Sequence, residues 1–137
     1  MKLYCDNDVI HKLATFDLHA EALAALGLGA RDVFVLPTAR YFFCAHKPAK
    51  GEIKFGAPVF GRIVAILDAV SVIEEAPPPE YERLLAGIPG IDQGEAILFG
   101  VAAANQGTLV ATADRKSLLA LARTPRAPRW SIPWRGA

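Results

Sequence analysis

The sequence has few of the residues that build disulfide frameworks or zinc sites. Its two cysteines are Cys5 and Cys44, and its three histidines show no metal-ligand spacing. The two thiols could pair in principle, but in a reducing compartment they are expected to be small buried hydrophobes. No apolar run reaches the roughly 18 residues that cross a bilayer, and the N-terminus lacks the basic and apolar segments of a secretion signal. We therefore expect a cytoplasmic protein with no membrane partner.

Charged residues are also scarce. They make up 21% of the 137 residues against 53% hydrophobic residues, the formal net charge is +1, and the mean hydropathy is +0.27. This composition excludes intrinsic disorder and predicts a well-filled core or a subunit interface. The length suits one domain that folds without disulfides or a structural metal. We assign residues 1–125 to that domain and residues 126–137 to a basic C-terminal tail containing Trp130 and Trp134.

Apolar periodicity predicts strands that alternate with helices. The expected strands are 1–5, 32–36 and 108–112, and the last two read as buried strands. The expected helices are 7–26, 39–45, 60–70, 80–86, a nearly all-apolar helix within 91–107, and 117–123, with a loop at 46–58. This alternation predicts an α/β domain with three α/β/α layers around a mostly parallel sheet.

Acidic residues follow these elements at three separate places. Asp6 and Asp8 come after the first strand, Asp92 and Glu95 begin the apolar helix, and Asp114 follows the last strand. In parallel sheets, ligands bind beyond the carboxyl ends of the strands, so we expect Asp6 and Asp114 to meet there. Gathered carboxylates repel one another unless a cation neutralises them, and oxygen-only ligands favour Mg²⁺ or Mn²⁺. The pattern indicates metal-assisted hydrolysis of a phosphate ester.

Each acid also has a structural explanation. Asp92 and Glu95 have the spacing of a capping box, and Asp6 could cap the helix that follows it. Asp8 would then stand in the first helical turn, where the helix dipole favours a negative charge. Asp114 fits a turn before a helix. From the residues alone, both explanations stay open.

Four segments resemble, in the correct order, the PIN-domain nucleases, in the branch that includes toxin ribonucleases. They are "YCDNDVIHKLA", "LPTARYFF", "DQGEAILFGVAAANQG" and "TLVATADRKSLLAL". The helix containing "GEA", followed by a strand and "TAD", is the most specific part.

The resemblance implies a metal-dependent endoribonuclease of a kind that is often the toxin of a toxin–antitoxin pair. Asp6, Glu95 and Asp114 would be the catalytic carboxylates, and Asp92 would join them as a fourth ligand of Mg²⁺ or Mn²⁺. The expected partners are an RNA substrate, a second copy of the chain in a homodimer, and an antitoxin protein.

One feature departs from the family pattern. PIN domains usually carry an acid in the helix after the second strand, but "TARYFFCAH" has none. Glu52, Asp68 or Glu74 would replace it only if the chain folds back toward the other acids. A catalytically degenerate domain that serves dimerisation or protein binding is therefore an alternative, and Phe42 and Phe43 would suit a partner if they are exposed.

Basic residues near these segments are candidates for RNA binding. A nuclease must hold a polyanion, and phosphate contacts need cations. The candidates are Lys47, Lys50, Lys54, Arg115 and Lys116. An ordinary solvated surface would explain the same charges.

A different enzyme class is a further alternative. "LYCDNDVI" also resembles the Asp-x-Asp-x-Val opening of haloacid-dehalogenase-like phosphatases, in which Asp6 would be the nucleophile and Asp8 the acid/base. Thr38 could stand for the second motif of that family, but no convincing lysine motif follows.

Overall fold

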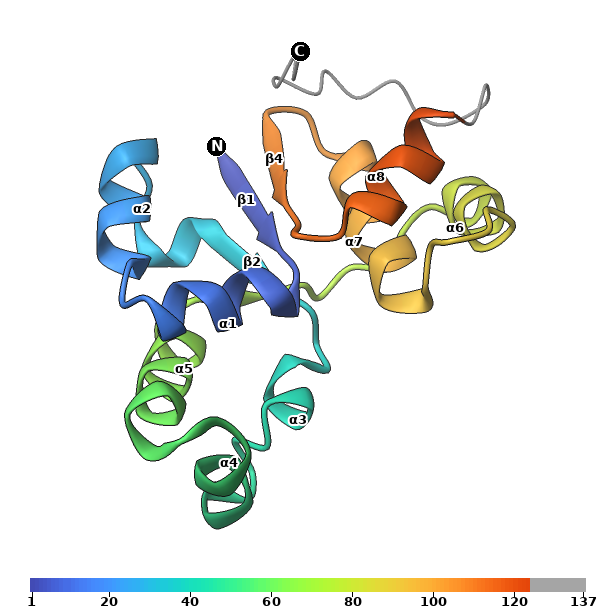
Figure 1. The fold of residues 1–137 in the computed structure, drawn as a ribbon. Coiled ribbons are helices and arrows are strands. Elements are labelled where there is room, and N and C mark those ends of the chain that lie inside the picture. The colour runs from blue at the N-terminus through green and yellow to red at the C-terminus, as the bar shows by residue number, and fades with distance from the viewer. Residues whose placement is uncertain (124–137) are drawn as a thin grey trace.

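A parallel sheet lies at the centre of the molecule (Figure 1). The computed structural model describes residues 1–123. The strands there are β1 (Lys2–Cys5), β2 (Val33–Val35), β3 (Ser71–Val72) and β4 (Thr108–Ala111), in the order β3-β2-β1-β4 and all parallel. The predicted α/β class is confirmed. The predicted tail, 126–137, lies outside the described residues.

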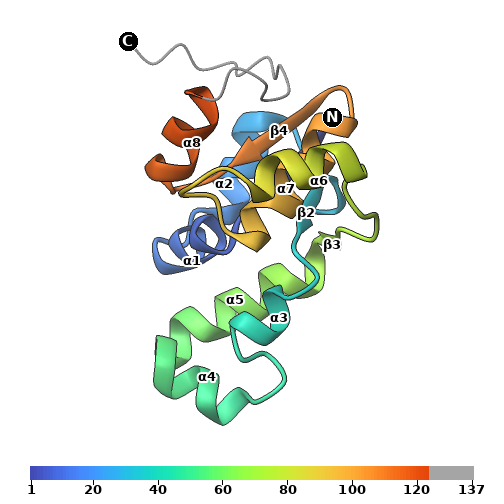
Figure 2. The ribbon, with the colours of Figure 1, turned by 90° about the vertical axis from the view of Figure 1, so that its right-hand side faces the viewer.

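Helices cover both faces of this sheet, as Figure 2 shows from the side. They are α1 (Asn7–Thr15), α2 (His19–Leu26), the 3₁₀ turn η1 (Ala30–Asp32), α3 (Ala39–Phe42), α4 (Pro48–Phe55), α5 (Ala57–Ala69), α6 (Pro79–Ala86), α7 (Gln93–Ala104) and α8 (Arg115–Ala122). None of these helices is long and apolar enough to cross a membrane.

The three layers follow from the period-two alternation of the strands. Leu3 and Cys5 point to one face of the sheet and pack with residues of α1 and α5, including Ile10 and Ile63. Tyr4, between them, points to the opposite face and joins a second cluster formed largely by α7. Because α7 contributes to two core clusters, its nearly all-apolar sequence is accounted for by burial.

The predicted single helix at 7–26 is wrong, because the chain breaks between α1 and α2. Asp17 takes a left-handed conformation with φ 54°, which Asp tolerates better than most residues. The helical spacing continues across this break, so periodicity alone did not reveal it.

The predicted loop at 46–58 is also wrong, because it contains α4. Pro48 is the first residue of that helix, a position where its missing N–H costs nothing. Two smaller corrections concern strands: β3 was not predicted, and β4 is half-buried rather than buried, since it lies at the end of the strand order.

Close packing of α4 on α5 predicts opposite effects for two glycine substitutions. A Cβ at Gly51 would lie 2.2 Å from the Phe60 ring, whereas a Cβ at Gly61 would meet nothing within 4 Å. Gly51→Ala should therefore destabilise the fold by about 1–3 kcal/mol, and Gly61→Ala should stabilise it by up to about 1 kcal/mol. Urea unfolding of both variants measures this; equal effects would contradict the packing of these helices.

Candidate functional site

The strand order reverses direction beside β1, and we call the region beyond the carboxyl ends of β1 and β4 the crevice. The chain builds β2 and β3 on one side of β1 and returns to place β4 on the other side. At such a reversal the connections leave in opposite directions, which opens a ligand site beyond the carboxyl ends of the strands. Asp6 follows β1 and Asp114 lies shortly after β4, so the sheet brings both to this end, as predicted.

Asp6 is almost fully hydrogen-bonded by the chain itself. Its Oδ1 accepts from the Val9 amide at 2.9 Å, which caps α1. Its Oδ2 accepts from the Thr112 hydroxyl and from the Ala113 amide, the latter at 3.3 Å. Burial raises the pKa of Asp6, and these hydrogen bonds oppose the rise. The structural explanation of Asp6 as a helix cap is realised, and the residue also ties β1 to the segment after β4.

Thr112 connects Asp6 with Asp114. Its Oγ1 donates to Asp6 and accepts from the backbone amide of Asp114 at 3.1 Å. The Asp114 side chain then caps α8, because its Oδ1 accepts from the amides of Lys116 at 2.9 Å and Ser117 at 3.2 Å. The sequence reading did not identify Thr112, although its place in "TAD" next to the predicted acid was a usable signal.

Asp92 and Glu95 lie at the start of α7, with Asp92 as its N-cap and Glu95 in its first turn. Asp92 Oδ1 accepts from the Glu95 amide at 2.8 Å and caps the helix. A Cβ at Gly94 would lie 3.2 Å from Leu36 Cδ1, so glycine lets α7 approach the end of β2 closely. This close approach is a physical reason for a small residue before Glu95 in "GEA".

Glu95 is the most perturbed carboxyl of the described chain. Burial, a hydrogen bond shared with Asp114, and the charges of Asp92 and Asp114 raise its pKa to about 8. The same hydrogen bond lowers the pKa of Asp114, so a proton at this site binds to Glu95 in preference to Asp114. Glu95 Oε2 is buried and finds no hydrogen-bond partner among the described residues. We call Asp92, Glu95 and Asp114 the acidic group.

The acidic group fits a hard divalent cation in its chemistry. All its ligand atoms are carboxylate oxygens, and one of them, Glu95 Oε2, is buried without a hydrogen-bond partner among the described residues. A cation would relieve the repulsion between carboxylates that helps to raise the pKa of Glu95. Within residues 1–123, no three acidic, histidine or cysteine side chains already converge as a metal-binding set. Asp92, Glu95 and Asp114 are the residues that would hold the ion, with Asp6 beside them through Thr112.

The other candidate acids lie elsewhere. Asp8 is exposed in the first turn of α1. On α3, where the PIN pattern has an acid, Arg40 instead pairs with Asp68 of α5 on the surface. Glu52 is exposed on α4. None of these residues joins the acidic group.

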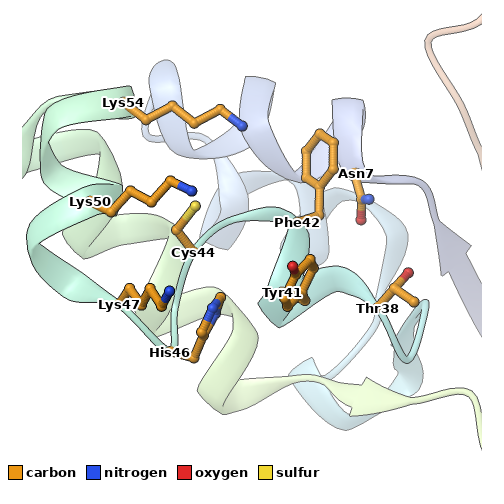
Figure 3. A pocket seen from close by; sticks show the side chains of 9 residues that line it. All are labelled: Asn7, Thr38, Tyr41, Phe42, Cys44, His46, Lys47, Lys50 and Lys54. Carbon is orange, nitrogen blue, oxygen red and sulfur yellow. The ribbon is translucent and has the colours of Figure 1, made fainter.

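The predicted lysines line a pocket on the other side of β1. Lys47, Lys50 and Lys54 reach from α4 and the residue before it toward the aromatic rings of α3 (Figure 3). The pocket has a volume of about 410 Å³. Its remaining lining residues are Asn7, Thr38, Tyr41, Phe42, Cys44 and His46, which the sequence reading had not joined to the lysines. We call it the basic pocket. Arg115 and Lys116 are exposed at the start of α8, next to Asp114.

Comparison with known proteins adds no relative. A scan against protein-family models and searches of curated proteins and of solved structures gave no significant match.

The double hydrogen bond of Thr112 predicts that its hydroxyl stabilises the site. Thr112→Val keeps the shape but leaves buried Asp6 short of a donor, so we expect a loss of about 1–3 kcal/mol. Thr112→Ser retains the hydroxyl and should recover most of that loss. Urea unfolding measures both; equal losses would show that the methyl group, not the hydroxyl, matters.

The raised pKa of Glu95 predicts a pH-dependent stability. An unfolded Glu titrates near 4.5, so between pH 4.5 and about 8 the folded chain holds a proton that the unfolded chain has lost. This contribution to the free energy of unfolding falls as pH rises through that window. At pH 8, Glu95→Gln should be more stable than the wild type by about 1–2 kcal/mol after allowance for solvent screening.

Chemical unfolding from pH 4.5 to 8.5 measures this difference, which should vanish at the acid end. Glu21→Gln, an exposed acid on α2, serves as the control and should track the wild type. A Glu95→Gln difference that stays constant with pH would contradict the raised pKa of Glu95.

Proposed function

We propose that the chain is a metal-dependent endoribonuclease that hydrolyses RNA phosphodiesters with Mg²⁺ or Mn²⁺. The observation that carries the proposal is that Asp92 and Glu95, at the start of α7, interact with Asp114 beyond β4, while the buried Oε2 of Glu95 has no hydrogen-bond partner among the described residues. Two carboxyls are kept close at the cost of a pKa raised to about 8, with Asp92 adding its charge. Such an arrangement is expected where a cation completes the site.

The residues of the site have two roles in this proposal, ion binding and positioning. Glu95, Asp114 and Asp92 would hold the ion, and Asp6 with Thr112 holds Asp114 in place. When bound, a divalent ion orients and acidifies a water and stabilises charge on a phosphodiester. Within the described chain, Oδ2 of both Asp92 and Asp114 accepts no backbone hydrogen bond, so each cap leaves one carboxylate oxygen without a backbone partner.

Two groups of cations near this end of the sheet support a polyanionic substrate. Lys47, Lys50 and Lys54 form one group, and Arg115 and Lys116 form the other. Phosphate backbones bind to lysine and arginine largely through charge. The proposal includes a role as the toxin of a toxin–antitoxin pair, acting in the cytoplasm as a homodimer.

A protein-binding module is the second candidate. The observation that favours it is that α3 carries no acid and has Arg40 paired with Asp68, together with exposed rings at Tyr41 and Phe42. Exposed apolar rings suit a protein partner. The phosphatase alternative is weaker, because Asp6, its nucleophile, already accepts three hydrogen bonds.

Cleavage of mixed-sequence single-stranded RNA tests the nuclease. We expect cutting with Mg²⁺ or Mn²⁺ and none with chelator. Glu95→Gln and Asp114→Asn should each lower the rate by at least about a hundredfold, the effect of removing one preorganised charged group. Glu21→Gln should cut like the wild type, because that acid lies on α2.

Ion binding is measured separately from cutting. At pH 8, Mg²⁺ or Mn²⁺ should raise the unfolding midpoint of the wild type and not that of Glu95→Gln. If the wild type shows neither RNA cutting nor stabilisation by these ions, the nuclease proposal is refuted and the binding module is favoured.

A further inference from the structure

The basic pocket carries an unusual local charge for a nearly neutral chain. Three lysines line it and no carboxylate does, although the chain has a formal net charge of +1. Lys47, Lys50 and Lys54 have the spacing that places side chains on one face of a helix. Among the described residues, none of these ammonium groups pairs with a carboxylate. The pocket therefore attracts an anion.

Aromatic rings stand beside these cations. Tyr41 stacks on His46 with ring centroids 5.0 Å apart and an interplanar angle of 10°, and the tyrosine remains 75% exposed. The stack therefore presents further ring surface to solvent. Phe42 is less available, because Lys54 lies over its ring at 5.3 Å. Rings of this kind bind unpaired bases, since every base has a flat face.

Polar groups complete the wall nearest the sheet. Thr38 supplies a hydroxyl, and Asn7 supplies an amide whose Oδ1 has no hydrogen-bond partner among the described residues. Asn7 directly follows Asp6, and Thr38 lies three residues after β2. The pocket thus opens at the carboxyl end of β1 and β2, while the acidic group lies at the carboxyl end of β1 and β4.

We infer that the basic pocket binds one unpaired nucleotide of a single-stranded RNA, with the base stacked on Tyr41 and the adjoining phosphates on Lys47, Lys50 and Lys54. The inference rests on the proposed ribonuclease function and specifies its substrate class. A duplex is excluded from this mode of binding because its bases are stacked on one another. The pocket selects single-stranded segments and places the neighbouring phosphodiester toward the crevice.

Binding without cleavage tests the pocket. The probe is a fluorescein-labelled ten-nucleotide RNA in chelator, followed by anisotropy, with the same sequence as a duplex for comparison. We expect the single strand to bind more tightly than the duplex. Lys50→Glu should weaken binding at least tenfold, and Lys12→Glu, an exposed lysine on α1, should weaken it much less at the same net charge.

A second pair of variants tests stacking. Tyr41→Leu should weaken binding of the single strand at least about fivefold, whereas Tyr41→Phe retains the ring and should bind like the wild type. Phe16→Leu removes another exposed ring, at 68% exposure, and should have no effect. In RNA with one 2-aminopurine, quenching on binding should disappear with Tyr41→Leu.

The outcomes separate this inference from the nuclease. If RNA binding depends on Lys50 and Tyr41 as expected but no metal-dependent cutting occurs, the pocket inference stands and the nuclease proposal is refuted. If Tyr41→Leu cleaves RNA at the wild-type rate, and Lys50→Glu and Lys12→Glu cleave at equal rates, the nuclease proposal stands and the pocket inference is overturned. Absence of RNA binding, or equal binding of the duplex, would also overturn the pocket.

Discussion

The parallel pairing of β1 with β4 brings together groups that are far apart in the chain. Asp6 and Thr112 are 106 positions apart and form a hydrogen bond only because Cys5 and Ala111 are partners in the sheet. From that one contact, Thr112 fixes the amide of Asp114, and the Asp114 carboxyl reaches Glu95 across the crevice. The position of the acidic group therefore depends on the register of these two strands.

Helix capping and ligand binding are compatible explanations for Asp92 and Asp114. Each uses Oδ1 to accept backbone amides at the start of a helix, which fixes the side chain and aligns it with a positive dipole end. A carboxylate has two oxygens, so a cap leaves one free. Glu95 differs because its buried Oε2 has no described partner and its pKa is raised. This residue is the one that a purely structural explanation accounts for least.

The sequence predicted the elements whose signals are local and strong. β1, β2, β4 and the apolar helix α7 follow from runs of apolar residues, and the placement of Asp6 and Asp114 at the same end of the sheet followed from parallel strands. The break at Asp17 and the two-residue β3 have no comparable periodic signal. The prolines of 46–58 led to the prediction of a loop, whereas Pro48 is the first residue of α4. Of the basic pocket, only the three lysines were predicted from the sequence. Its aromatic wall depends on how α3 and α4 fold against each other.

The acidic group and the basic pocket lie at the same end of the sheet and carry opposite charges. The acidic group lies beside β4, with Arg115 and Lys116 next to Asp114, and the three lysines of the basic pocket lie beside β2, with β1 between the two sets. A polyanion alone would be repelled by the acids, and a cation alone would be repelled by the lysines. Under the proposed function, the RNA strand would neutralise the lysines and the divalent ion would neutralise the carboxylates. Neither half by itself accounts for the arrangement of the other.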